Sequence, residues 1–150
     1  MLREEISAAL SEATKSQSRR RMCTLRLITA AIKDRDIAAR GAGKDKVSDD
    51  EIRLMMQKMI KQRDESIELY EKGGRLDLAE QERQEIGIIR DFLPKQMSDA
   101  EIANACEHVV REIGATGLRD MGKCMGVIKQ RYPGQMDFSR ANQVIKELIG

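Results

Sequence analysis

No cluster of residues in this sequence has the types and spacing that catalysis or metal binding requires. The single histidine, His108, has no nucleophile placed to pair with it, because Cys106 two positions earlier points to another side of a helix. Asp64, Glu65 and Glu68 have lysines and arginines as neighbours but no histidine, which favours surface ion pairs over a metal site. We therefore expect no catalytic residues and no metal ion or other cofactor.

The three cysteines do not indicate a disulfide framework. Cys23, Cys106 and Cys124 are odd in number and lack CxxC spacing, which argues against both disulfides and a zinc site. Free cysteine behaves as a small apolar residue and is often buried. We expect all three to lie in the hydrophobic core.

A first basic cluster follows the first predicted helix. It comprises Lys15, Arg19, Arg20, Arg21 and Arg26. Three consecutive arginines at a helix start oppose the helix dipole, so they need anions nearby, either acids of the same protein or phosphates. No aromatic residue is interleaved, so stacking on nucleic-acid bases is not indicated. A solvated face with local ion pairs is the alternative interpretation.

A second basic segment begins at Arg119 and contains two glycines one helical turn apart, Gly122 and Gly126. A glycine inside a helix costs about 1 kcal/mol relative to alanine, so two of them require a reason. One reason is the close approach of a neighbouring helix. The other is the close approach of a phosphate or ribose, with Arg119, Lys123 and Lys129 around it.

The elements that position these residues are predicted to be helices. Apolar residues recur at helical spacing, prolines number only 2, and no segment alternates as a strand would. Capping signals at Ser48 and Ser98 mark two helix starts, and Pro94 ends a helix. The predicted helices span residues 2–14, 19–40, 48–72, 76–92, 99–112, 118–131 and 138–149.

The break around Pro94 divides the chain into two predicted domains. Residues 1–94 are expected to form a hairpin or bundle of long helices, and residues 98–150 a small three-helix domain. The fold class is therefore all-α. Arg63 shares the predicted inner face of helix 48–72 with apolar residues. Either its stem lies at the rim of this face with the charge in solvent, or the side chain is buried and pairs with an acid of a neighbouring helix.

Charge and hydropathy narrow the possible partners. Lysine and arginine total 27 against 25 aspartates and glutamates, so any contact with nucleic acid must come from local clusters. No apolar run approaches the roughly 18 residues of a membrane span. The first residues form an amphipathic helix rather than an apolar signal region. We expect a cytoplasmic protein without a membrane partner.

Four segments together carry a resemblance to a known family. The segments are Thr24–Lys33, Lys61–Tyr70, Phe92–Ser98 and Asp120–Gly126. In their order and spacing they resemble the YqeY family, and the resemblance covers nearly the whole chain. The C-terminal block is also similar to the tail domain of the B subunit of tRNA-dependent amidotransferases, which convert misacylated Glu-tRNA(Gln) or Asp-tRNA(Asn) to the amide form.

The resemblance implies a two-part helical protein whose C-terminal part contacts the body of tRNA rather than the reacting ester. In the amidotransferase, a kinase-like cradle and a separate glutaminase subunit perform the chemistry, and this chain resembles neither. The matching motif lies on a helix that faces RNA or packs against the protein: Met121, Gly122, Lys123, Met125 and Gly126. Cys124 stands where the family more often has an aliphatic residue, which is compatible with a core position.

These observations predict a non-catalytic accessory protein that binds tRNA or a tRNA-handling complex. The expected RNA contacts are Arg119, Gly122, Lys123, Gly126 and Lys129, with Arg19, Arg20 and Arg21 as a second group. Aminoacyl-tRNA and the amidotransferase machinery are the related candidate partners. The family label of carbon–nitrogen ligase with glutamine as amido-N-donor is not expected to describe this chain alone. The rival interpretation is a protein–protein adaptor that does not bind RNA.

Overall fold

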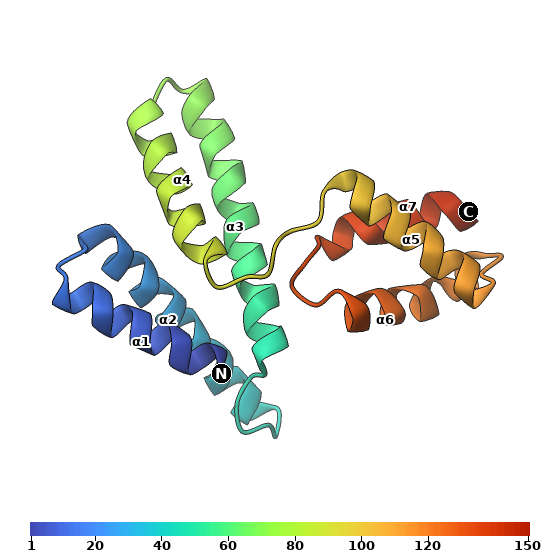
Figure 1. Ribbon diagram of the computed structural model, residues 1–150, viewed down its shortest axis with the longest axis horizontal. Helices are drawn as coiled ribbons and strands as arrows, with labels where there is room; N and C mark the ends of the chain where they lie inside the picture. Colours follow the sequence, from blue (N-terminus) through green and yellow to red (C-terminus); the bar gives the residue numbers. More distant parts are fainter. The chain divides into compact units, whose positions relative to one another are not determined.

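The computed structural model describes all residues from Met1 to Gly150 and consists of helices and their connections (Figure 1). There is no β-strand, so the predicted all-α fold class is confirmed. The α-helices and one short 3₁₀ helix, η1, follow in this order: α1 (Leu2–Lys15), α2 (Arg19–Gly41), α3 (Asp49–Lys72), α4 (Leu76–Arg90), α5 (Asp99–Ile113), η1 (Leu118–Asp120), α6 (Met121–Arg131) and α7 (Phe138–Ile149).

The chain separates into two compact units. The N-terminal unit comprises Met1–Leu93 and the C-terminal unit Pro94–Gly150. Helices α1–α4 belong to the first, and α5–α7 with η1 belong to the second. The division falls at the proline that cannot continue a helix.

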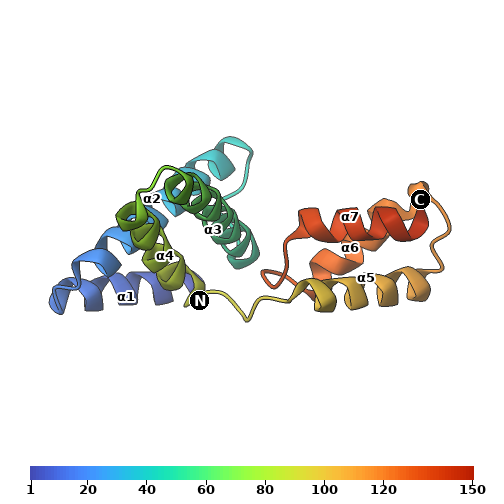
Figure 2. The same cartoon turned by 90° about the horizontal axis from the view of Figure 1, so that it is seen from above.

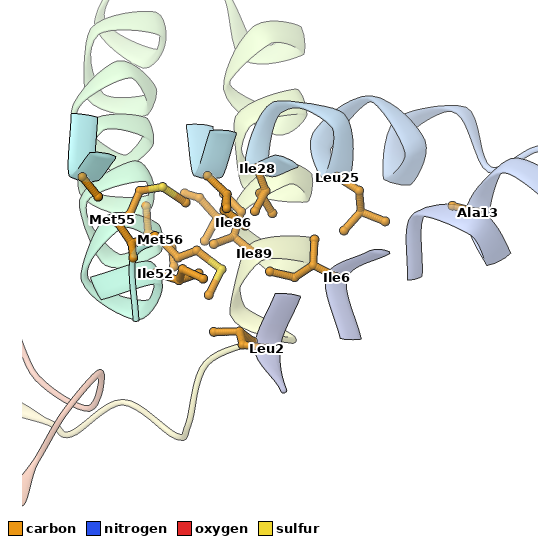
Figure 3. Close-up of a cluster of buried hydrophobic side chains, with 14 residues drawn as sticks. Leu2, Ile6, Ala13, Leu25, Ile28, Ile52, Met55, Met56, Ile86 and Ile89 are labelled. Atoms are coloured by element: carbon orange, nitrogen blue, oxygen red, sulfur yellow. The ribbon is translucent and has the colours of Figure 1, made fainter. Parts of the chain in front are cut away.

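The N-terminal unit is built from two helical hairpins. Helix α1 packs along α2, α3 packs along α4, and α2 also contacts α4 (Figure 2). Apolar side chains from all four helices meet in one core, shown in Figure 3. Its fully buried members include Ile6, Leu25, Ile28, Ile52, Met56 and Ile89. Aliphatic and methionine side chains fill this core because the sequence has few aromatic residues.

A network of charged and backbone groups joins the start of α1 to α2 and to the loop before α3. Both terminal nitrogens of Arg3 donate to the Asp36 carboxylate, at 2.7 and 2.6 Å. Arg3 also donates to the Val47 carbonyl, and the Val47 N–H donates to Asp36 at 3.0 Å. These bonds hold the pKa of Asp36 at about 2, chiefly through Arg3 and then through the Val47 N–H.

Arg63 of α3 is a partly buried ion-pair partner rather than an exposed charge. Its Nε lies 3.1 Å from Glu85 and 3.8 Å from Glu82, both on α4, and its side chain is 15% exposed. Burial raises the pKa of Glu82, and the neighbouring Glu85 charge raises it further. Of the two sequence interpretations, the pairing with acids of a neighbouring helix is confirmed.

The C-terminal unit is a three-helix arrangement in which each helix packs against the other two. Its fully buried core includes Cys106, Val109, Cys124, Ile128, Ala141 and Ile145. Ser98 and Glu101 form the predicted capping box at the start of α5, and Gly114 ends that helix in the left-handed conformation. Asp137 caps α7 by accepting the N–H of Ser139 at 2.9 Å. The short helices are thus held by well-defined ends.

One predicted helix begins later than expected. Residues 118–131 were predicted as one α-helix, but Leu118–Asp120 form a 3₁₀ turn and the α-helix begins at Met121. The Asp120 carboxylate accepts the N–H of Thr116 at 3.0 Å. An aspartate that bonds to the backbone behind it favours a turn over a continued helix.

Candidate nucleic-acid interface

Helix α6 presents one buried face and one open face. Cys124 and Ile128 are fully buried on the inner side, where α5 and α7 pack. Gly122, Lys123, Gly126 and Lys129 are exposed on the outer side. The spacing of the inner residues at i and i+4 therefore fixes the outward direction of the glycines and lysines.

The turn before α6 carries the first cation of this surface. The Asp120 carboxylate holds the loop through its bond to the Thr116 N–H, which lowers the pKa of Asp120. Arg119 stands next to it in η1 and is exposed. We call Arg119, Gly122, Lys123, Gly126 and Lys129 the α6 cationic face.

The two glycines of the α6 cationic face have no role in packing within the chain. A Cβ atom built at Gly122 or at Gly126 would meet nothing within 4 Å. The interpretation that a neighbouring helix of this chain packs closely on them is therefore wrong. Each glycine still costs the helix about 1 kcal/mol relative to alanine. The fold gains nothing in return, so the open backbone requires an explanation outside the chain.

No cation of the α6 cationic face forms an ion pair within the protein. The charges of Arg119 and Lys123 still reach the nearby Asp120 carboxylate and, after the Thr116 N–H, help to lower its pKa. Arg119, Lys123 and Lys129 make no ion pair and no side-chain hydrogen bond. Arg131, two residues after Lys129, shows the contrast: both its terminal nitrogens donate to Glu112, at 2.6 and 2.7 Å. This bond lowers the pKa of Glu112. The outer face thus retains its positive charge, whereas the neighbouring arginine is neutralised.

The other predicted cations lie in the N-terminal unit, at the first turn of α2. Arg19 and Arg20 are exposed and form no ion pair, whereas Arg21 lies 3.1 Å from Asp91, beyond α4. The structure therefore brings five of the predicted residues together on α6 and η1. It places the three consecutive arginines in a separate group on the other unit.

The cysteines and the histidine are the remaining residues of reactive types. Burial raises the pKa of Cys106 to about 11 and also raises that of Cys124, so both thiols stay protonated. His108 is exposed and lies 4.0 Å from Glu112. No three histidine, cysteine or acidic side chains are grouped so that they could hold a metal ion.

Cys23 differs from the sequence prediction. It was expected in the core with the other two cysteines, but it is exposed, whereas Cys106 and Cys124 are buried. The inner face of α2 is taken by Thr24, Leu25 and Ile28, and Cys23 precedes Thr24 by about 100° of helical rotation. The pattern of neighbouring apolar residues was the signal that could have placed it outside.

The sequence interpretation also missed a hollow in the N-terminal unit. Gln84 and Gly87 of α4 lie with Arg19–Arg21 around an open cavity. The available signal was a glycine in the middle of a predicted helix, with no turn following it.

Comparison with protein families identifies the chain. The family model described as Yqey-like protein matches residues 3–149. The chain belongs to the YqeY family. The four segments that suggested the resemblance therefore belong to one continuous family match.

Two relatives extend this YqeY protein's comparison to fungi. A protein of Lachancea thermotolerans named "Altered inheritance of mitochondria protein 41, mitochondrial" is 34% identical over 95 residues, 62% of this chain and 49% of its own length. An uncharacterized protein of Schizosaccharomyces pombe is 32% identical over 98 residues, 65% of this chain and 76% of its own. The matched region thus spans about half of the first relative and three quarters of the second.

The relatives do not establish the location of this chain in the cell. The name of the first places that protein in mitochondria, so the expected cytoplasmic location of this chain stays a prediction. None of the helices of the YqeY chain is both long enough and apolar enough to cross a membrane.

Proposed function

We propose that this YqeY protein is a non-catalytic accessory protein that binds tRNA through the α6 cationic face. The observation that carries the proposal is the combination of two open helical glycines with three unpaired cations on one face. Phosphate oxygens accept hydrogen bonds from arginine and lysine, and glycines let a sugar–phosphate backbone approach a helix closely. The similarity of residues 98–150 to the amidotransferase tail supports tRNA as the RNA concerned.

The chemistry of this face favours contacts to the RNA backbone over contacts to bases. No aromatic side chain belongs to the α6 cationic face, and Tyr132 beyond its end is half-buried. Base recognition on single strands relies on aromatic or guanidinium stacking, whereas backbone binding relies on positive charge. Binding should therefore be sensitive to salt and should recognise shape more than sequence.

We propose no activity for the chain alone. The thiols are buried and His108 has only a carboxylate near it. Purified protein is expected to release no ammonia from glutamine and to leave aminoacyl-tRNA unchanged. Aminoacyl-tRNA or the amidotransferase machinery would then be a partner rather than a substrate.

A protein–protein adaptor is the second candidate function, favoured by a different observation. Leu118 is 55% exposed and Leu148 is 47% exposed in the C-terminal unit. A Cβ on Gly150, which follows α7, would lie 3.6 Å from Leu118 Cδ2, so Leu118 lies beside the end of the helix that carries Leu148. Exposed apolar groups of this kind suit a protein partner. An affinity for protein that does not change with salt would support this function.

The experiment that tests the proposal reverses the charge at two positions of the face. The Lys123→Glu, Lys129→Glu variant should bind labelled tRNA at least tenfold more weakly by fluorescence anisotropy, a change of about 1.4 kcal/mol. The matched control is Lys95→Glu, Lys146→Glu, which changes the same charge on exposed residues of the same unit outside the face. Equal weakening by both pairs, or by neither, would contradict the site.

A further inference from the structure

The N-terminal unit contains a hollow of about 510 Å³ between the first turn of α2 and the last two turns of α4. The α2 side is formed by Ser18 and Arg19–Arg21, and the α4 side by Gln84, Gly87 and Asp91. Its volume is in the range of about 300–1,000 Å³ found for small-molecule sites. The surface is open to solvent and positively charged, since three arginines face one aspartate.

Gly87 keeps this hollow open at a cost to its own helix. It lies inside α4, where glycine is less favourable than alanine. A Cβ atom at Gly87 would meet nothing within 4 Å, so the packing of α4 does not require a glycine. Any larger side chain at this position would project into the hollow. The absence of a side chain therefore leaves the hollow open on the α4 side.

The arginines of the hollow are only partly neutralised. The carboxylate of Asp91 lies 3.1 Å from Arg21 and is the one acid in the lining. Arg19 and Arg20 have no ion pair, and the first turn of α2 contains no acidic residue. Positive side chains at this end of a long helix are unfavourable unless an anion accompanies them. Two guanidinium groups are thus left with donors and no acceptor.

Ser18 also leaves hydrogen-bonding capacity unused at the same place. Ser48 and Ser98 cap their helices through the side chain, whereas Ser18 makes no capping bond. Its hydroxyl oxygen lies 3.1 Å from that of Ser16 instead. The first hydrogen bond of α2 is donated by the Met22 N–H to the Ser18 carbonyl. The backbone N–H groups of residues 19–21 therefore have no partner within the helix. The residues that carry these backbone donors and guanidinium groups therefore line one hollow.

We propose that this hollow binds a phosphate group. The phosphate oxygens would accept hydrogen bonds from Arg19 and Arg20 and from the amide side chain of Gln84. Asp91 would hold Arg21 in place. The phosphate can belong to an RNA backbone or to a small phosphate compound, because both present the same oxygens. The site belongs to the N-terminal unit and does not depend on RNA binding by the α6 cationic face.

The test is an NMR titration of the full chain with inorganic phosphate. The backbone signals of Arg19–Arg21 and Gly87 should shift in ¹H–¹⁵N spectra with a saturable dependence on concentration. Gly87→Leu, which fills the hollow and favours helix, should weaken phosphate binding at least tenfold, about 1.4 kcal/mol. Arg20→Glu should do the same. Gln81→Leu on α4 and Lys33→Glu on α2, both exposed and outside the hollow, are the matched controls.

The source of the phosphate is decided by repeating the titration with tRNA. If the hollow takes an RNA phosphate, Gly87→Leu and Arg20→Glu will weaken tRNA binding, and the control variants will not. If it takes a small phosphate, the same variants will lose inorganic phosphate binding and keep tRNA affinity. Signals of Arg19–Arg21 and Gly87 that stay unmoved by both ligands would overturn the proposal. That result would leave tRNA binding by α6 unaffected.

Discussion

Arg63 and the cations of the α6 cationic face carry the same charge in opposite surroundings. Arg63 lies between α3 and α4 with Glu85 at 3.1 Å and Glu82 at 3.8 Å, and only 15% of its side chain is exposed. Arg119, Lys123 and Lys129 are exposed and have no carboxylate within ion-pair distance. The first cation joins two helices, whereas the other three are available to an anion from outside.

The difference shows how to separate charges that maintain a fold from charges that serve a ligand. A half-buried cation has lost solvation and depends on its acids, so removing it leaves their charges uncompensated. An exposed, unpaired cation contributes little to stability, and removing it leaves the helix intact. The two groups should therefore respond differently to mutation, with stability changing in one and binding in the other.

The largest expected effect on stability is at Arg63. Replacing it by methionine in the variant Arg63→Met keeps much of the volume but leaves Glu82 and Glu85 without their cation. The free energy of unfolding should fall by about 3 kcal/mol, measured by urea denaturation. Affinity for tRNA should be unchanged.

Arg90→Met is the matched control, because Arg90 is exposed on α4 and forms no ion pair. It should change the free energy of unfolding by no more than about 0.5 kcal/mol. Equal losses in the two variants would show that the comparison between paired and unpaired cations is mistaken.

The second effect concerns the glycines of α6 and has the opposite sign. Gly122→Ala, Gly126→Ala should raise the free energy of unfolding by up to about 1 kcal/mol per site, because each new Cβ has free space. The same two methyl groups should weaken tRNA binding several-fold, since they hold the RNA backbone away from the helix.

Gly41→Ala is a suitable control for these glycine variants. Gly41 is the last residue of α2, and a Cβ there also meets nothing within 4 Å. This control should leave tRNA affinity as in the parent protein. A stabilised α6 variant with full tRNA affinity would mean that the glycines do not approach the RNA.

The smallest expected effect is the acid dependence contributed by Asp36, which solvent partly screens. Its pKa is about 2 in the folded chain, against an ordinary value of 3.8. Because the folded value is the lower one, its stabilisation is present above pH 3.8 and is lost as the pH falls toward 2. Asp36→Asn should lower the thermal midpoint at neutral pH and flatten its decline with acid. An undiminished decline in the variant would rule out this role.

The sequence predicted the helices well because their ends carry local signals. Ser98 with Glu101 and Asp137 with Ser139 form the caps that their residue types suggest. The 3₁₀ turn at Leu118–Asp120 was not predicted, because the bond from the Thr116 N–H to Asp120 competes with helix only in the folded loop. The choice of partners for Arg63 likewise depended on how α3 and α4 pack.

The residues of the candidate site could be named from the sequence, but the reason for the two glycines could not. Gly122 and Gly126 were identified from their spacing, yet both helix packing and ligand approach stayed open as explanations until the space around them was known. The hollow beside Arg19–Arg21 escaped prediction because Gly87 is far from these arginines in sequence. A sequence pattern shows which side chains share a helix face, whereas only packing shows which face remains open.

The most direct test of tRNA binding through phosphate contacts is the salt dependence of tRNA affinity for the parent chain and for Lys123→Glu, Lys129→Glu. The parent should bind tRNA at low salt and weaken steeply as salt increases, because each phosphate contact releases counterions. In a plot of log affinity against log salt, the variant should show a slope smaller by about one unit per lost contact. Absence of tRNA binding at low salt, or the same slope in both proteins, would contradict phosphate recognition by α6.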